Sequence, residues 1–200
     1  MALKLFGVTV NDAHLISMSV PDTETIVVRD LAAVCSTAEY RAISADDDSA
    51  AAQNRVISIL TARGPVLPAP IGVVFRSGES VERWLELHYG ALTDALTFVE
   101  NRVAARVHVF RQTVDDERTD MSTIAEECLR VLRTSAVATL PLRAEKLTGV
   151  IVSAAFLVEQ DKWNDFVLDV DAQSKIALGL RFDLTGPWPP YDFVQMQLQA

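Results

Sequence analysis

Apolar and β-branched runs dominate the first forty residues of the chain. The turn signals Asn11-Asp12 and Pro21-Asp22 separate three of these runs, which we interpret as strands. A fourth run is compatible with a strand or with the opening of a helix. In chain order the four ranges are 3–10, 14–20, 25–28 and 31–37.

Two later segments carry apolar residues at three- and four-residue spacing, which predicts amphipathic helices. The first covers residues 47–62, begins at an aspartate triplet, ends at Gly64-Pro65 and buries Val56, Ile59 and Leu60. Between the two helices, the proline-rich residues 65–75 predict entry into a sheet at its edge. The second helix starts at residues 77–79 and presents one continuous face: Val81, Trp84, Leu85, His88, Leu92, Leu96 and Val99.

The second half of the chain alternates strands with helices. Residues 103–109 have period two, and residues 147–158 are almost continuously apolar, as in a buried central strand. Helices are expected at 121–134, with Met121, Ile124, Cys128 and Val131 inward, and at 161–173, and a last strand over 176–184. This order predicts an α+β fold of two small subdomains, with mixed or antiparallel sheets, helices on one face and a ferredoxin-like part. We place an N-terminal α+β domain at 1–75 and a C-terminal, ferredoxin-like domain at 76–200.

Charge and cysteine content narrow the classes of partner. The net charge of -9 disfavours nucleic acid, because phosphate binding needs a basic face, and it also disfavours anionic membrane surfaces. Cys35 and Cys128 lie in apolar, regularly patterned segments and are expected as buried, reduced thiols. No run approaches the roughly 18 apolar residues of a membrane span, so a cytoplasmic location is the default expectation.

Motifs for catalysis, cofactor binding and metal binding are absent from the sequence. It contains no phosphate-binding loop, nucleophile elbow, Cys-x-x-Cys or His-Glu-x-x-His, so we predict no catalytic, cofactor or metal residues. His88 is expected to be a hydrogen-bonded histidine at the edge of the core. Under the alternative of a small-ligand site on a ferredoxin-like scaffold, His88, His108 and Arg106 are the first candidates.

The segment Thr185 to Val194, TGPWPPYDFV, is unusual for the end of a strand. Gly186 permits an uncommon turn, and the prolines order the backbone before any binding event, so large aromatic side chains are presented at little entropic cost. Such a segment forms either a clasp over the protein's own core or a binding hot spot. The candidate partner-binding residues are Trp188, Pro189, Pro190, Tyr191 and Phe193.

Residues 184–194, LTGPWPPYDFV, resemble the C-terminal signature of the gas vesicle protein F/L (GvpF/GvpL) family, which reads close to LTGPWPPYSFV. Three further stretches resemble segments of that family in the same order: VRDLAAVCS at 28–36, PVLPAPIGVVF at 65–75 and SAAFLVEQDKWNDF at 153–166. Ala69-Pro70-Ile71-Gly72 departs from the family's Leu-Arg-Phe-Gly, and a middle segment looks shortened. The chain is therefore similar to a shortened, diverged member.

The resemblance implies a non-enzymatic accessory role in gas vesicle formation, without a cofactor. The implied partners are the main gas vesicle shell protein and other gas vesicle accessory proteins, and the implied location is cytoplasmic and gas vesicle-associated. A soluble protein with an open sheet edge or an apolar groove suits the delivery of an aggregation-prone shell subunit. The alternative interpretation is a diverged scaffold or small-ligand-binding α+β protein unrelated to gas vesicles.

Overall fold

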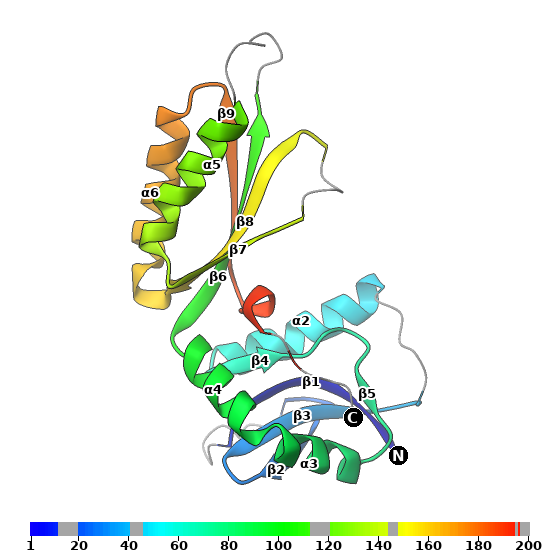
Figure 1. Cartoon of the computed structure of the whole chain (residues 1–200). Coiled ribbons are helices and arrows are strands. Elements are labelled where there is room, and N and C mark those ends of the chain that lie inside the picture. The colour runs from blue at the N-terminus through cyan, green and yellow to red at the C-terminus, as the bar shows by residue number, and fades with distance from the viewer. Residues whose placement is uncertain (12–19, 41–45, 113–120, 144–147, 195, 197–200) are drawn as a thin grey trace. The chain divides into compact units, whose positions relative to one another are not determined.

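The computed structural model describes residues 1–11, 20–40, 46–112, 121–143, 148–194 and 196. These residues form two compact units, one of residues 1–101 with 194–200 and the other of residues 102–193 (Figure 1). The division falls after Asn101, whereas we had expected it after residue 75. The strand expected at 14–20, except Val20, lies outside the described residues.

The first unit contains a five-stranded antiparallel sheet. Its strands are β1 (Ala2–Val10), β2 (Glu24–Val28), β3 (Leu31–Ala38), β4 (Val66–Pro68) and β5 (Val74–Phe75). Their order is β2-β3-β1-β4, and β5 also pairs with β1. The apolar run at 31–37 is therefore a strand, and the proline-rich segment does enter the sheet at an edge.

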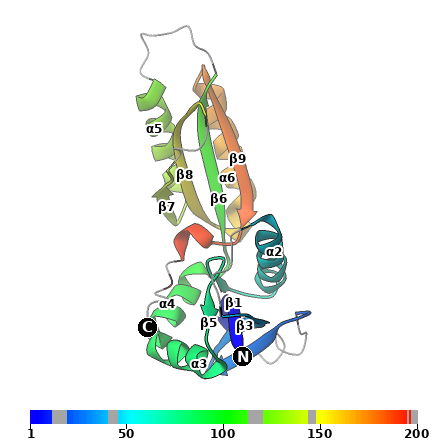
Figure 2. The ribbon, with the colours of Figure 1, turned by 90° about the vertical axis from the view of Figure 1, so that its right-hand side faces the viewer.

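Helices cover both faces of this sheet (Figures 1 and 2). The helices α3 (Gly78–Leu87) and α4 (Tyr89–Val99) pack on one face, and α2 (Asp47–Thr61) lies against the other. Gln53 of α2 is 1% exposed, and its Nε2 donates hydrogen bonds to the backbone oxygens of Phe6 and Ala69. Even Lys4 of β1 is buried, with its Nζ 4.9 Å from the centre of the Phe6 ring. The sequence predicted helices on one face of each sheet. This prediction is correct for the second unit and wrong for the first.

The predicted long helix is broken at His88 into α3 and α4. His88 has φ -104° and ψ 12°, outside the helical region, and Gly90, a weak helix former, follows two residues later. The predicted apolar face is nevertheless buried, because Val81, Trp84 and Leu92 belong to the core of the first unit. This packing explains why the unit extends to Asn101. The Nε2 atom of His88 is buried without a hydrogen-bond partner, so the expected hydrogen-bonded histidine was wrong for that atom.

The second unit has the order β6 (Arg102–Arg111), α5 (Met121–Leu132), β7 (Ala138–Pro141), β8 (Val150–Glu159), α6 (Trp163–Ile176) and β9 (Leu180–Trp188), with short 3-10 turns at Arg133–Ser135, Gln160–Lys162 and Tyr191–Phe193. All pairs are antiparallel, in the order β7-β8-β6-β9. Both helices pack on one face of the sheet (Figure 1). This is the ferredoxin-like βαββαβ arrangement, as predicted; β7 was not foreseen.

Two details of the second unit differ from the sequence prediction. On α5 the buried side chains are Met121, Ala125, Cys128, Leu129 and Leu132, whereas Val131 is 38% exposed. The inward face is therefore rotated from the predicted one. The last strand begins at Leu180, because α6 continues to Ile176 and Gly179, with φ +85°, separates the two elements. Ile176 and Leu178 are consequently 72% and 82% exposed.

The two cysteines are free and buried, as predicted. Burial, with Glu24 nearby, raises the pKa of Cys35 to about 12, and burial raises the pKa of Cys128. Since the thiolate is the reactive form, we expect Ellman's reagent at pH 8 to find no fast-reacting thiol in the native protein and two after unfolding in denaturant. A fast thiol in the native protein would contradict the buried position of one cysteine.

Candidate functional site on the helix-free face of the second unit

The face of the second sheet that lies opposite α5 and α6 carries polar side chains in register. Val107 and Val109 of β6 are fully buried in the core beneath the helices. Arg106 and His108 alternate with them and therefore point to the other face. Arg106 pairs with Ala155 of β8 and Thr185 of β9, and His108 with Ser153 and Asp183. In Figure 2, β8, β6 and β9 lie side by side, with α6 along the sheet.

Gly186 allows β9 to run tightly against β6 beside this face. Its φ is +134°, a conformation that L side chains rarely adopt. A Cβ atom there would lie 2.8 Å from the Ala104 backbone oxygen and 2.8 Å from Cη2 of Trp163. The glycine of the terminal segment is thus required by both conformation and space. It lies inside β9, where the pairing with β6 shifts register between Ala104 and Arg106, and not in the turn predicted at this position.

An ion pair between Arg106 and Asp192 connects the segment after β9 to β6. Both Nε and Nη2 of Arg106 donate 2.8 Å hydrogen bonds to the Asp192 carboxylate, and these bonds raise the pKa of Arg106. The paired geometry orients the short turn Tyr191–Phe193 on the sheet. The sequence offered no signal for this pair, because its members are 86 residues apart.

The five predicted partner-binding residues are consecutive or nearly so, but their environments differ. Pro190 is buried, and Pro189, Tyr191 and Phe193 are half-buried. Burial raises the pKa of Tyr191 to about 12. Trp188 is 49% exposed, and its Nε1 donates a 3.2 Å hydrogen bond to Oγ1 of Thr185. One large aromatic is therefore presented outward by a segment whose other members are largely packed.

The residues considered for a small-ligand site belong to different units, and two of them already have hydrogen-bond partners. Arg106 is bound to Asp192, and His108 Nδ1 is hydrogen-bonded to Ser153 Oγ. Ser153 is only 2% exposed, so its hydroxyl is enclosed within the sheet. His88 belongs to the first unit, between α3 and α4. The contacts of Arg106 and His108 thus satisfy polar groups within the second unit.

The sequence matches a known protein family over most of its length. The model of the family described as "Gas vesicle synthesis protein GvpL/GvpF" matches residues 5–123 and 115–195. The chain belongs to the GvpL/GvpF family. The terminal segment 185–194 lies inside the matched region, so the resemblance inferred from its residues is confirmed.

Curated relatives agree with this assignment to the GvpL/GvpF family. Gas vesicle protein F2 of Halobacterium salinarum is 27% identical over 180 residues, which cover 88% of this chain and 82% of the relative. Gas vesicle protein F of Haloferax mediterranei is 26% identical over 185 residues, covering 88% and 83%.

Solved structures of GvpF share the fold. The crystal structure of GvpF from an Anabaena species matches with a TM-score of 0.78 and 16% identity, covering 98% of this chain and 97% of that chain. GvpF from Microcystis aeruginosa matches with a TM-score of 0.73 and 15% identity, covering 98% and 99%. The α+β fold is therefore that of the GvpF structures, and the family gives the chain a gas vesicle-related role. No helix within the described residues is long and apolar enough to cross a membrane.

Proposed function

We propose that this protein is a non-enzymatic assembly factor of the gas vesicle, which binds the main shell protein in the cytoplasm during shell formation. Other gas vesicle accessory proteins are further partners under the same proposal. Membership of a gas vesicle synthesis family supports the setting. The observation that carries the proposal is the half-exposed Trp188 at the end of β9.

Trp188 has the properties of a binding hot spot. Tryptophan is enriched among residues that dominate binding energy, since it buries a large apolar area with few rotatable bonds. Here the adjoining backbone is already fixed by the close approach of Gly186 to Ala104, and the following turn by the Arg106–Asp192 pair. Binding at such a residue costs little further ordering.

The other candidate residues hold this aromatic in place under the proposal. Pro190 is buried, and Pro189, Tyr191 and Phe193 are half-buried, which suits a supporting role with partial contact to the partner. The clasp and the hot spot predicted from the sequence are then two parts of one segment. Residues 189–193 form the clasp, and Trp188 is the contact.

Trp188→Ala is expected to weaken binding of the main shell protein by roughly 30-fold or more, because hot-spot truncations cost about 2 kcal/mol or more. The measurement is quantitative retention of the main shell protein, co-expressed from the same organism, on the tagged protein. The melting temperature should change little, since substitutions of exposed residues usually alter stability by less than about 0.5 kcal/mol.

Leu168→Ala is the matched control, because Leu168 is an exposed apolar residue, 65% exposed, on α6 of the same unit. It should leave both binding and melting unchanged. If the Trp188→Ala variant binds the shell protein normally, Trp188 is not the contact residue. If its melting temperature falls by many degrees, Trp188 belongs to the clasp. Failure of the unmodified protein to retain any gas vesicle protein, over several salt concentrations, would overturn the proposed function itself.

A further inference from the structure

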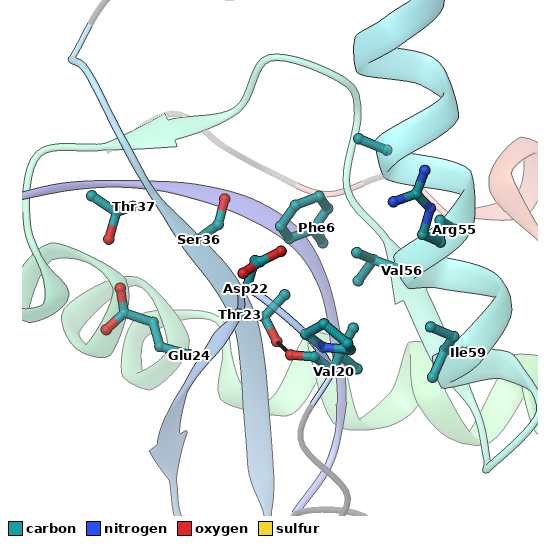
Figure 3. A pocket seen from close by; sticks show the side chains of 12 residues that line it. Phe6, Val20, Asp22, Thr23, Glu24, Ser36, Thr37, Arg55, Val56 and Ile59 are labelled. Carbon is teal, nitrogen blue, oxygen red and sulfur yellow. Dashed lines mark hydrogen bonds between the residues drawn. The ribbon is translucent and has the colours of Figure 1, made fainter.

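A hollow lies in the first unit, between α2 and the sheet. Its volume is about 780 Å³. The lining from the sheet side includes Phe6, Asp22 and Ser36, which face Arg55, Val56 and Ile59 of α2 across the opening (Figure 3). The floor is apolar, with Phe6 5% and Val56 7% exposed, and the rim is polar. An apolar floor with a few polar rim groups is typical of a binding site.

The hollow, hereafter the α2 groove, reaches the edge of β3 beyond the end of its pairing with β2. Ser36 and Thr37 both line it, although successive side chains of a strand point to opposite faces. The groove therefore reaches the end of β3 at which Ser36 and Thr37 lie. On its other edge β3 pairs with β1 through Ala38, but its pairing with β2 ends at Cys35. Among the described residues, Ser36 to Ala38 thus have a strand neighbour on one side only.

The chain turns away from β3 at this point. Asp22 has φ +59°, in the left-handed region, and a 2.8 Å hydrogen bond from Thr23 Oγ1 to the Val20 oxygen closes the turn that contains it. Val20 and Pro21 therefore do not extend the pairing of β2 with β3, which ends at Glu24 and Cys35. Within the described part of the chain, the result is a short strand edge without a neighbouring strand, next to an apolar hollow.

The rim of the α2 groove carries three charged side chains. Asp22 and Glu24 line its sheet side, and Arg55 lines its helix side. All three are exposed, and none has an ion-pair partner among the described residues. Two carboxylates favour a basic side chain on the occupant, whereas a guanidinium can donate to main-chain carbonyl oxygens.

We infer that the α2 groove binds an extended segment of a partner protein by strand addition to β3. The segment places an apolar side chain over Phe6 and Val56 and a basic side chain between Asp22 and Glu24. Main-chain hydrogen bonds supply affinity and the side-chain pocket supplies specificity, as in other cases of strand addition to a sheet edge. The inference rests on the proposed function, in that the partner is the main shell protein, and it adds a second contact to the one at Trp188.

The test is site-specific photo-crosslinking in the co-expressed complex with the main shell protein. Thr37→p-benzoylphenylalanine puts the crosslinker on the rim of the groove, and Thr97→p-benzoylphenylalanine, on the exposed side of α4, is the control. We expect a crosslink from position 37 and none from position 97. Mass spectrometry should map the crosslink to a segment of the shell protein with a basic residue beside apolar ones.

A charge variant tests the rim separately. Asp22→Asn with Glu24→Gln should reduce the crosslink yield at position 37 at least five-fold, and asparagine tolerates the left-handed backbone at position 22. Asp94→Asn with Glu82→Gln, on exposed positions of α4 and α3, makes the same change in net charge and should leave the yield unchanged.

Each outcome bears on a different statement. Retention of the shell protein without a crosslink from position 37, or with a crosslink that maps to an acidic segment, overturns the groove inference and leaves the proposed function standing. Equal crosslink yields from the two charge variants would show that Asp22 and Glu24 do not contribute to binding in the groove. Loss of all retention by the unmodified protein overturns both the proposed function and the inference that rests on it.

Discussion

Gly186→Ala is expected to destabilise the second unit by about 2–4 kcal/mol. Two physical effects add here: strain of a side chain in the left-handed backbone region, and overpacking of a new methyl group. The methyl group would lie 2.8 Å from the Ala104 backbone oxygen, which cannot move without displacing β6. Urea unfolding gives the total change in free energy, and amide hydrogen exchange in β6 and β9 assigns it to this unit.

Gly90→Ala is the control for the loss of a glycine. Gly90 lies in α4, a Cβ atom added to it would meet no other atom within 4 Å, and it has no strained backbone angle. Alanine there should be neutral or stabilise by about 0.5–1 kcal/mol, because glycine is unfavourable within a helix. If the two substitutions changed the free energy of unfolding equally, the close approach of β9 to β6 would not contribute to stability.

Phe156→Ala is expected to cost about 3–5 kcal/mol, the largest effect of any single substitution considered for this protein. Phe156 is fully buried on β8, and its ring centre lies 5.3 Å from that of Phe166 on α6. The substitution removes this ring contact and leaves a cavity between sheet and helix. Urea unfolding measures the loss, and hydrogen exchange should show it in β8 and α6.

Val131→Ala serves as its counterpart on α5. The sequence predicted an inward position for Val131, but the residue is 38% exposed, so the cost should stay below about 0.5 kcal/mol. A cost near 2 kcal/mol would favour the predicted orientation of α5 over the observed one. The pair of variants thus tests both the core and the correction to the helix face.

Strand patterns were the most predictable part of the second unit. In β6, alternate apolar residues face one helix-covered side, and a period of two in the sequence reports that directly. In α5 the choice between Val131 and its neighbours Leu129 and Leu132 depends on a rotation of the helix by a fraction of a turn. All three residues are apolar, so their sequence pattern does not fix that rotation.

The first unit shows a different limit. β1 carries Lys4 and Thr9, whose polarity indicates an exposed face, yet both are buried because α2 covers that side. Gln53 shows the same limit. This polar residue of α2 is buried because its side chain donates hydrogen bonds to two backbone oxygens inside the unit. Such requirements come from the tertiary packing and leave no local pattern.

For the candidate site, the terminal segment was identifiable from composition alone. Which of its residues is exposed was not, because Trp188 and Tyr191 are both large aromatics in a proline-rich context. Their difference arises from the approach of β9 to Ala104 and from the distant partner of Asp192. The rim of the α2 groove combines residues from three separate segments and was likewise hidden from the sequence.

The first unit is interrupted in the chain, and this bears on how the protein forms during translation. Residues 102–193 are contiguous, so the second unit has all its residues once Phe193 has left the ribosome. Val194 and Met196 pack against the core of the first unit, although they are synthesised after the whole of the second unit. The first unit therefore acquires its full core only after the second unit is complete, when Val194 and Met196 pack against residues that were made long before them.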